Sequence, residues 1–122
     1  MKSFAGKTVL VVDDDVDLCD IIADELADAG FTVEKAFSGN QAIKALEKKA
    51  FDLVLTDIKM PEGSGIDLLK FIRQKSTSTP VVLMMTGFVD FSESDLISMG
   101  AKVIFRKPVL VEKMLAQLET IF

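Results

Sequence analysis

Two kinds of apolar pattern alternate along the chain. Short runs rich in β-branched residues predict strands, and longer segments with apolar residues every three or four positions predict helices. The predicted strands are Thr8 to Asp13, Phe31 to Ala36, Phe51 to Asp57, Pro80 to Thr86 and Ala101 to Phe105. The first, third and fourth are almost continuously apolar, as central parallel strands buried on both faces should be.

The helical pattern is clear in four segments between or after these strands. They are marked by Leu18, Ile22 and Leu26, by Ala42, Ile43 and Leu46, by Leu68, Leu69 and Ile72, and by Val111, Met114, Leu115, Leu118 and Ile121. A further helix over about Phe91 to Met99 has a weaker apolar stripe, and Asp90 is expected to cap its start, with Glu93 three residues later. Gly30 and Gly100 lie where two helices should end, because glycine accepts the left-handed conformation common there.

This alternation predicts an α/β fold of the (βα)5 type, in which helices cover both faces of a doubly wound parallel sheet. A chain of 122 residues with 49% hydrophobic residues is long enough for one such domain. Residues 1–122 contain no linker, repeat or low-complexity segment, so a single domain is expected. In sheets of this kind ligands bind beyond the carboxyl ends of the strands, and the residues there are the first candidates for a site.

The composition excludes several classes of function. The 14 basic and 19 acidic residues give a net charge of -5 without a polybasic run, so direct binding to nucleic acid or to an anionic membrane is not expected. Histidine is absent, which excludes a histidine base and a phosphohistidine on this chain. Cys19 is the single cysteine, and no apolar run reaches membrane-spanning length or resembles a signal peptide. A cytoplasmic protein is therefore expected.

Charged and hydroxyl side chains stand at the strand ends. Asp13 and Asp14 come at the end of the first strand, Asp57 ends the third, Thr86 ends the fourth, and Lys107 follows the fifth. Three converging carboxylates repel one another, but magnesium prefers oxygen ligands and the Lys107 ammonium would balance the remaining charge. Such a site can hold a phosphoryl oxygen, and a carboxylate such as Asp57 can act as the nucleophile in phosphoryl transfer.

These residues stand in motifs that resemble the receiver domain of bacterial two-component response regulators. The motifs are VLVVDD, LVLTDIKMPEGSG, VVLMMTG and GAKVIFRKPV. The resemblance covers essentially the whole chain and implies a flavodoxin-like sheet with strand order 2-1-3-4-5. It also implies a signalling switch that catalyses only its own phosphorylation and dephosphorylation, and that turns over no external substrate.

The resemblance assigns the phosphoryl acceptor and the metal ligands. Asp57 would accept a phosphoryl group from a phosphohistidine on a sensor histidine kinase or a phosphotransfer protein. Magnesium, or manganese in its place, would be bound directly by Asp14 and Asp57, through water by Asp13, and by the backbone carbonyl of Lys59.

The resemblance also implies how phosphorylation would be transmitted. Lys107 would pair with the phosphoryl oxygens and the Thr86 hydroxyl would move to hydrogen-bond one of them, with Gly87 as the hinge of the loop from Thr86 to Asp90. The surface of the fourth helix, fifth strand and last helix would then contact a downstream protein or a missing output domain. The sequence ends at Phe122, so no output domain is expected within it, and dimerisation on phosphorylation is left open.

Two features depart from the family pattern or fall where the family varies. Family members usually place Phe or Tyr three residues before the strand-five lysine, where this chain has Ile104, and Phe105 should face the other side of the sheet. Lys59 and Phe88 flank the expected path of attacking water. The bulky Phe88 is predicted to slow hydrolysis of the acyl phosphate, which a Phe88→Ala variant would reverse.

Other interpretations of the acidic residues were weighed. Asp15 and Asp17 more simply cap the first helix and complement its dipole. A phosphohydrolase with Asp13 as nucleophile would need Thr or Val where Asp17 stands, and a calcium-binding loop would need glycine in place of Leu18. The main alternative is a receiver-like scaffold that binds partners without being phosphorylated, because Ile104 replaces the usual aromatic residue.

Overall fold

The computed structural model describes residues 4–87 and 92–122, so Phe88, Asp90 and Phe91 lie outside the described residues. Within these ranges, parallel strands form one sheet in the order β2-β1-β3-β4-β5, which confirms the predicted topology. The strands are β1 (Thr8–Val12), β2 (Thr32–Ala36), β3 (Leu53–Asp57), β4 (Val81–Thr86) and β5 (Val103–Arg106). The helices are α1 (Val16–Asp28), α2 (Gly39–Lys48), α3 (Gly65–Lys75), α4 (Glu93–Ser98) and α5 (Val111–Ile121).

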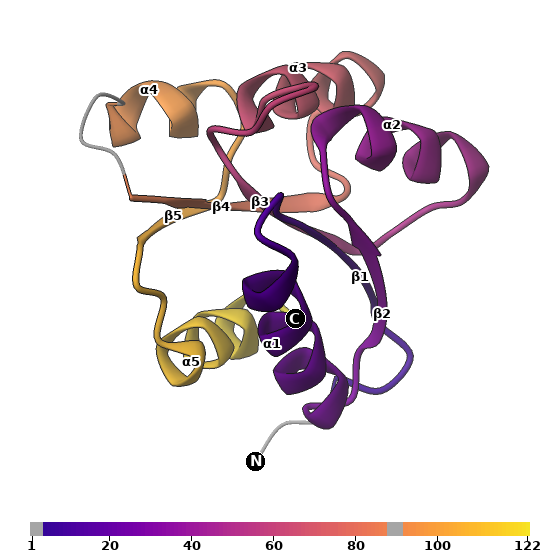
Figure 1. Cartoon of the computed structure of the whole chain (residues 1–122), viewed down its shortest axis with the longest axis vertical. Coiled ribbons are helices and arrows are strands. Elements are labelled where there is room, and N and C mark those ends of the chain that lie inside the picture. The colour runs from indigo at the N-terminus through magenta and orange to yellow at the C-terminus, as the bar shows by residue number, and fades with distance from the viewer. Residues whose placement is uncertain (1–3, 88–91) are drawn as a thin grey trace.

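Helices cover both faces of the sheet, as the alternating pattern predicts. Figure 1 shows α2, α3 and α4 above the sheet, and α1 and α5 below it. Successive residues of a strand point to opposite faces, so Leu10 and Val12 pack in the core under α2 and α3, while Val9 and Val11 pack with α1 and α5. The sheet therefore separates two apolar cores, and the central strands are buried on both sides.

Several predicted strand boundaries are wrong by one or two residues. Phe31 and Phe51, predicted as the first residues of strands, lie before β2 and β3, although both are buried. At the other end of the sheet, β5 continues through Arg106, one residue beyond the predicted end. Apolar character identifies residues that enter the core, but it does not distinguish a strand residue from a buried residue that leads into the strand.

The predicted start of α4 is also wrong. The helix begins at Glu93, and its N-cap is Ser92, whose side chain accepts a hydrogen bond from the N–H of Asp95 at 3.3 Å. A serine hydroxyl satisfies one of the N–H groups that a helix start leaves unpaired, so this cap stabilises a helix that begins at Glu93.

Other predicted helix ends are confirmed. Asp15 is the N-cap of α1, and its side chain accepts a hydrogen bond from the N–H of Leu18 at 3.1 Å. Gly30 and Gly100 follow α1 and α4 with φ of +115° at both positions, which is the left-handed region that favours glycine.

Cys19 packs in the core between α1 and the sheet. Its side chain is fully buried, and its Sγ lies 3.7 Å from the carbonyl oxygen of Val11. Burial raises the pKa of the Cys19 thiol to about 11, so the thiol is protonated at neutral pH and behaves as a small apolar group. No helix among the described residues is both long and apolar enough to cross a bilayer.

Candidate functional site

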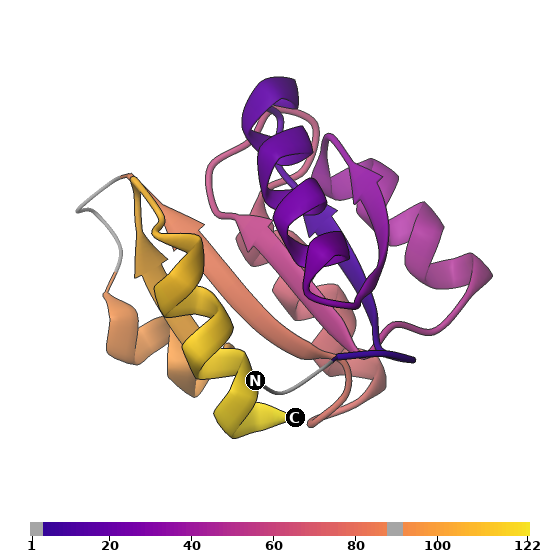
Figure 2. The same cartoon turned by 90° about the horizontal axis from the view of Figure 1, so that it is seen from below.

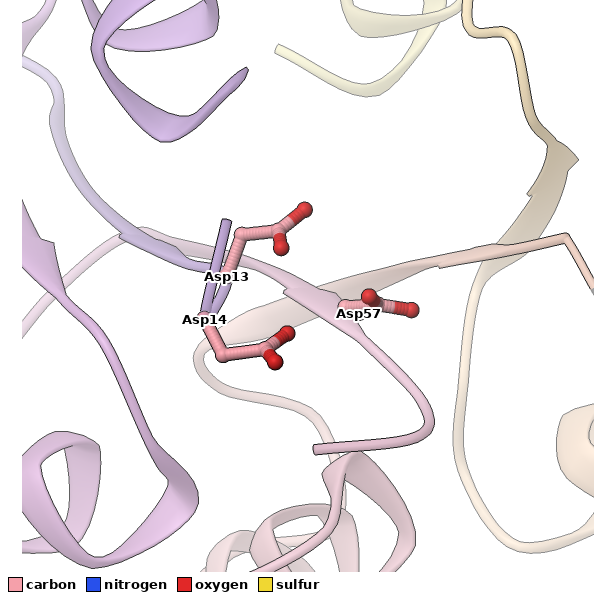
Figure 3. A group of neighbouring side chains, drawn as sticks. All are labelled: Asp13, Asp14 and Asp57. Carbon is pink, nitrogen blue, oxygen red and sulfur yellow. The ribbon is translucent and has the colours of Figure 1, made fainter. Parts of the chain in front are cut away.

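The carboxyl ends of the central strands bring the predicted site residues together. Asp57 is the last residue of β3, Thr86 is the last residue of β4, and Asp13 directly follows β1. Because these strands are parallel neighbours, the residues lie along one edge of the sheet. Figure 3 shows the carboxylates of Asp13, Asp14 and Asp57 extending into the same space from two strand ends.

The three aspartates form a cluster that fits a hard metal ion. Each offers one carboxylate oxygen, and these oxygens lie within 4.8 Å of one another. Asp13 and Asp57 are buried, with 0% and 7% exposure, whereas Asp14 is exposed. Oxygen ligands that leave one side open to water suit magnesium, which retains several waters, and also manganese. The residues present therefore fit the expected metal.

Lys107 supplies the positive charge at this cluster. Its Nζ donates hydrogen bonds to Oδ2 of Asp57 at 2.9 Å and to Oδ2 of Asp13 at 3.1 Å. Burial by itself lowers the pKa of the Lys107 ammonium, but the hydrogen bonds to Asp57 and Asp13 outweigh it, and the pKa lies above its ordinary value. The lysine therefore stays charged between the two buried carboxylates.

Asp13 is the least favourably placed carboxylate of the cluster, because its side chain is completely buried. Burial raises the pKa of its carboxyl, and the hydrogen bonds from the Asp15 N–H and from Lys107 offset that effect only in part. A cation that binds beside such a carboxylate stabilises its charged form, because the cation replaces the hydration that burial has removed.

The backbone around Asp57 fixes the orientation of its side chain. Oδ1 accepts a hydrogen bond from the N–H of Ile58 at 2.7 Å, while Oδ2 faces Lys107. The carbonyl oxygen of Asp57 accepts a hydrogen bond from the Thr56 hydroxyl at 2.8 Å. Both carboxylate oxygens are therefore held by donors, and the carboxylate is presented at the strand end in one orientation.

Sequence reasoning missed how tightly the loop after β3 is packed. The N–H of Gly65 donates to the carbonyl oxygen of Ile58 at 2.7 Å, and a Cβ on Gly65 would overlap the carbonyl oxygen of Asp57. On the other side, the first N–H groups of α2 donate to the carbonyls of Glu62 at 3.1 Å and Gly63 at 3.0 Å. Glu62 and Gly63 both have positive φ. The glycines of the EGSG segment were the available signal, because each marks a turn or a close backbone approach.

Of the other predicted residues, Thr86, Ile104 and Lys59 are described by the structure and Phe88 is not. Thr86 is buried, and its carbonyl oxygen accepts a hydrogen bond from the Lys107 N–H at 2.8 Å, which joins the ends of β4 and β5. Ile104 packs in the core under α2, α3 and α4, and Phe105 packs in the opposite core, which confirms the predicted alternation. Lys59 is exposed and follows Ile58 directly. The effect predicted for Phe88 concerns a residue outside the described ranges.

Replacing Lys107 by methionine should destabilise the magnesium-free protein. Removing one partner of a buried ion pair costs about 3–5 kcal/mol, and the 22% exposure of the lysine side chain reduces this to about 1–3 kcal/mol. The loss should shrink as the pH falls through the raised pKa of Asp13, because protonated Asp13 no longer repels Asp57. Urea unfolding at several pH values, with and without magnesium, measures the effect.

A matched variant separates the site from general charge effects. Lys113 is exposed, so Lys113→Met removes the same charge without touching the cluster. It should change the free energy of unfolding by less than about 0.5 kcal/mol. Equal losses in the two variants would show that Lys107 does not hold the carboxylates together.

Comparison with known families and sequences identifies relatives along nearly the whole chain. The family model described as "Response regulator receiver domain" matches residues 9–119. The transcriptional regulatory protein DltR of Streptococcus agalactiae is 30% identical over 110 residues, covering 90% of this chain and 49% of DltR. The transcriptional regulatory protein ZraR of Salmonella typhimurium is 37% identical over 112 residues, covering 91% of this chain and 25% of ZraR. The chain thus spans about half or less of the length of these relatives.

Solved structures of similar fold include CheY and CheY-like proteins. A CheY-like receiver domain protein from Methanospirillum hungatei has a TM-score of 0.86 and 29% identity, covering 93% of this chain and 91% of the other. A chain in the CheX-CheY-BeF3-Mg complex from Borrelia burgdorferi has a TM-score of 0.89 and 26% identity, with coverage of 97% and 90%.

Proposed function

The chain belongs to the family of response regulator receiver domains, and we propose that it is a phosphorylation-controlled switch in which Asp57 accepts the phosphoryl group. The position of Asp57 carries this proposal. Its buried carboxylate lies 2.9 Å from the ammonium of Lys107, with oxygens of Asp13 and Asp14 within 4.8 Å. A nucleophile, a cation and metal ligands thus meet in one place, as transfer to a carboxylate requires.

The transfer moves a phosphoryl group from a nitrogen to an oxygen. A carboxylate oxygen of Asp57 attacks the phosphorus of a phosphohistidine, a P–O bond forms, and the P–N bond breaks as the imidazole leaves. Residues 1–122 contain no histidine, so the donor phosphohistidine lies outside them, on a sensor histidine kinase or a phosphotransfer protein. The immobilised Asp57 side chain is held for attack, which lowers the entropic cost of the step.

The charges at the site favour a divalent cation. The aspartates and Lys107 together carry a formal charge of -2, which one divalent cation would neutralise. Asp14 and Asp57 would hold magnesium directly, with Asp13 acting through water and Lys59 through its carbonyl. Bound there, magnesium offsets the negative charge that develops during phosphoryl transfer. Lys107 would pair with the phosphoryl oxygens once they occupy the site.

Phosphorylation would change the conformation of the chain at the ends of β4 and β5. The acyl phosphate adds about one negative charge, and Thr86 and Lys107 move toward it, linked by the backbone hydrogen bond between them. The surface of α4, β5 and α5 would then change its affinity for a downstream protein or an output domain. The relatives DltR and ZraR are transcriptional regulators, which supports an output of this kind.

Phosphoryl uptake from a small donor tests the proposal. The wild-type protein, incubated with acetyl phosphate, should gain one phosphoryl group in intact mass when magnesium is present and none when it is chelated. Peptide mapping should place the added group on Asp57. Intrinsic fluorescence is a poor substitute, because the chain has neither Trp nor Tyr.

The opposite result would favour a different function. If neither acetyl phosphate nor a phosphorylated histidine kinase domain adds a phosphoryl group, the chain works as a scaffold that binds partners without phosphorylation. Ile104 is the observation that favours this second function, because an aliphatic side chain packed in the core replaces the aromatic residue expected there.

A further inference from the structure

Arg73 on α3 is tied to the end of α4. Its Nε donates a hydrogen bond to the carbonyl oxygen of Gly100 at 3.0 Å. Gly100 leaves room for this contact, because a Cβ at that position would lie 2.6 Å from Nε. The guanidinium is therefore held in place between α3 and the turn that leads into β5, at the opposite end of the strands from Asp57.

Within residues 4–87 and 92–122, the charge of Arg73 has no carboxylate partner. Its Nη1 is buried and has no hydrogen-bond acceptor among the described residues, the only such side-chain atom there. Burial lowers the pKa of Arg73, with no nearby carboxylate to raise it. A guanidinium nevertheless stays charged, and a buried, unpaired donor on a charged group costs free energy. Arg73 is only half-buried, and an anion in contact with the accessible part of its guanidinium would pair this charge.

A cavity of about 530 Å³ adjoins Arg73. Lys102 and the hydroxyl residues Thr77 and Ser78 line it, together with the end of α5. Figure 2 shows the chain end after α5 beside the loop that precedes β4. Among the residues that the structure describes, no acidic side chain lines this cavity. Its volume lies within the range of small-molecule sites.

We propose that this cavity binds a small anion through a phosphate or carboxylate group placed between Arg73 and Lys102. The guanidinium is a planar donor that suits both oxyanions, and its fixed position reduces the ordering cost of binding. Lys102 adds a second positive charge, and the hydroxyls of Thr77 and Ser78 can donate to the remaining oxygens. The site lies far from the aspartate cluster along the strands, so the anion and the phosphoryl group do not compete.

A titration with inorganic phosphate followed by NMR tests the site. In magnesium-free buffer, with ionic strength held constant by potassium chloride, the amide signals of Thr77, Ser78, Gly100 and Lys102 should shift and saturate. The signals of Asp13 and Asp57 should not. Arg73→Lys keeps the charge but loses the planar donor, and it should weaken binding about tenfold. Lys102→Met, at an exposed position, should also weaken binding, and Lys113→Met should not.

The outcomes distinguish specific anion binding from a general effect of ionic strength, and they identify the class of anion. Saturable shifts with phosphate alone indicate a phosphate-bearing ligand, and saturable shifts with acetate or citrate indicate a carboxylate. Shifts that rise without saturation, that chloride reproduces, or that persist unchanged in Lys102→Met overturn the proposal.

Discussion

Asp57→Asn is expected to abolish phosphoryl uptake while the protein stays folded. The amide has the shape of the carboxylate but is not a nucleophile toward phosphorus. One amide oxygen can still accept from the Ile58 N–H, which in the wild type lies 2.7 Å from Oδ1. Loss of one negative charge from the cluster also removes repulsion with Asp13, so magnesium-free stability should change by no more than about 1 kcal/mol.

The same variant should lose its response to magnesium. A ligand present at about 100 times its Kd stabilises the wild type by about 2.7 kcal/mol, and most of this gain should disappear when a buried ligand is replaced. Intact mass after incubation with acetyl phosphate measures uptake, and urea unfolding with and without magnesium measures the metal response. Both are recorded on the same protein preparations.

Asp17→Asn is the matched control. Asp17 is exposed in the first turn of α1, so this variant makes the same chemical change near the cluster without altering it. Phosphoryl uptake and the magnesium response should match those of the wild type. Full uptake by Asp57→Asn, or its loss in Asp17→Asn, would place the acceptor elsewhere.

The periodicity of apolar residues was sufficient to predict the strands and four of the helices, whereas the strand order 2-1-3-4-5 came from the family resemblance. Strands such as Leu53–Asp57 are buried on both faces, so their apolar runs leave little ambiguity. Element ends were harder to predict, because Ser and Asp are both good N-caps: the sequence pattern favoured Asp90, whereas α4 is capped by Ser92. Sequence therefore predicts the element more reliably than its first residue.

The candidate site was predictable in residue type but not in geometry. Rules for parallel sheets place Asp13 and Asp57 at one edge, yet they do not predict that Asp13 is buried while Asp14 is exposed. Lys107 bridges Asp13, which is 94 positions away in the sequence, and Asp57, which is 50 positions away. No local sequence pattern predicts contacts between residues so far apart. Arg73 gave no sequence signal either, because its unpaired nitrogen depends on how α3 and α4 pack.

Gly65→Ala is expected to destabilise the protein strongly and to displace the acceptor. A Cβ on Gly65 would overlap the carbonyl oxygen of Asp57 and lie 2.9 Å from Cα of Ile58 and 3.0 Å from the carbonyl carbon of Asp57. These are backbone atoms of β3 and its following residue, so no side chain can rotate away to relieve the overlap. Overpacking costs about 1–3 kcal/mol where neighbours can adjust, and the upper end, about 3 kcal/mol, is expected here.

Gly87→Ala is the control for adding a methyl group near the same edge of the sheet. The new Cβ would meet only Cβ of Lys107, at 3.9 Å, which is an ordinary contact. Its free energy of unfolding should stay within about 0.5 kcal/mol of the wild type. Urea unfolding compares the two variants, and acetyl phosphate labelling of Gly65→Ala against the wild type, at a temperature where both are folded, tests the acceptor. Because the added methyl pushes on Asp57 itself, Gly65→Ala should also be phosphorylated more slowly; a folded Gly65→Ala protein labelled at the wild-type rate would mean that the loop after β3 shifts without moving the carboxylate.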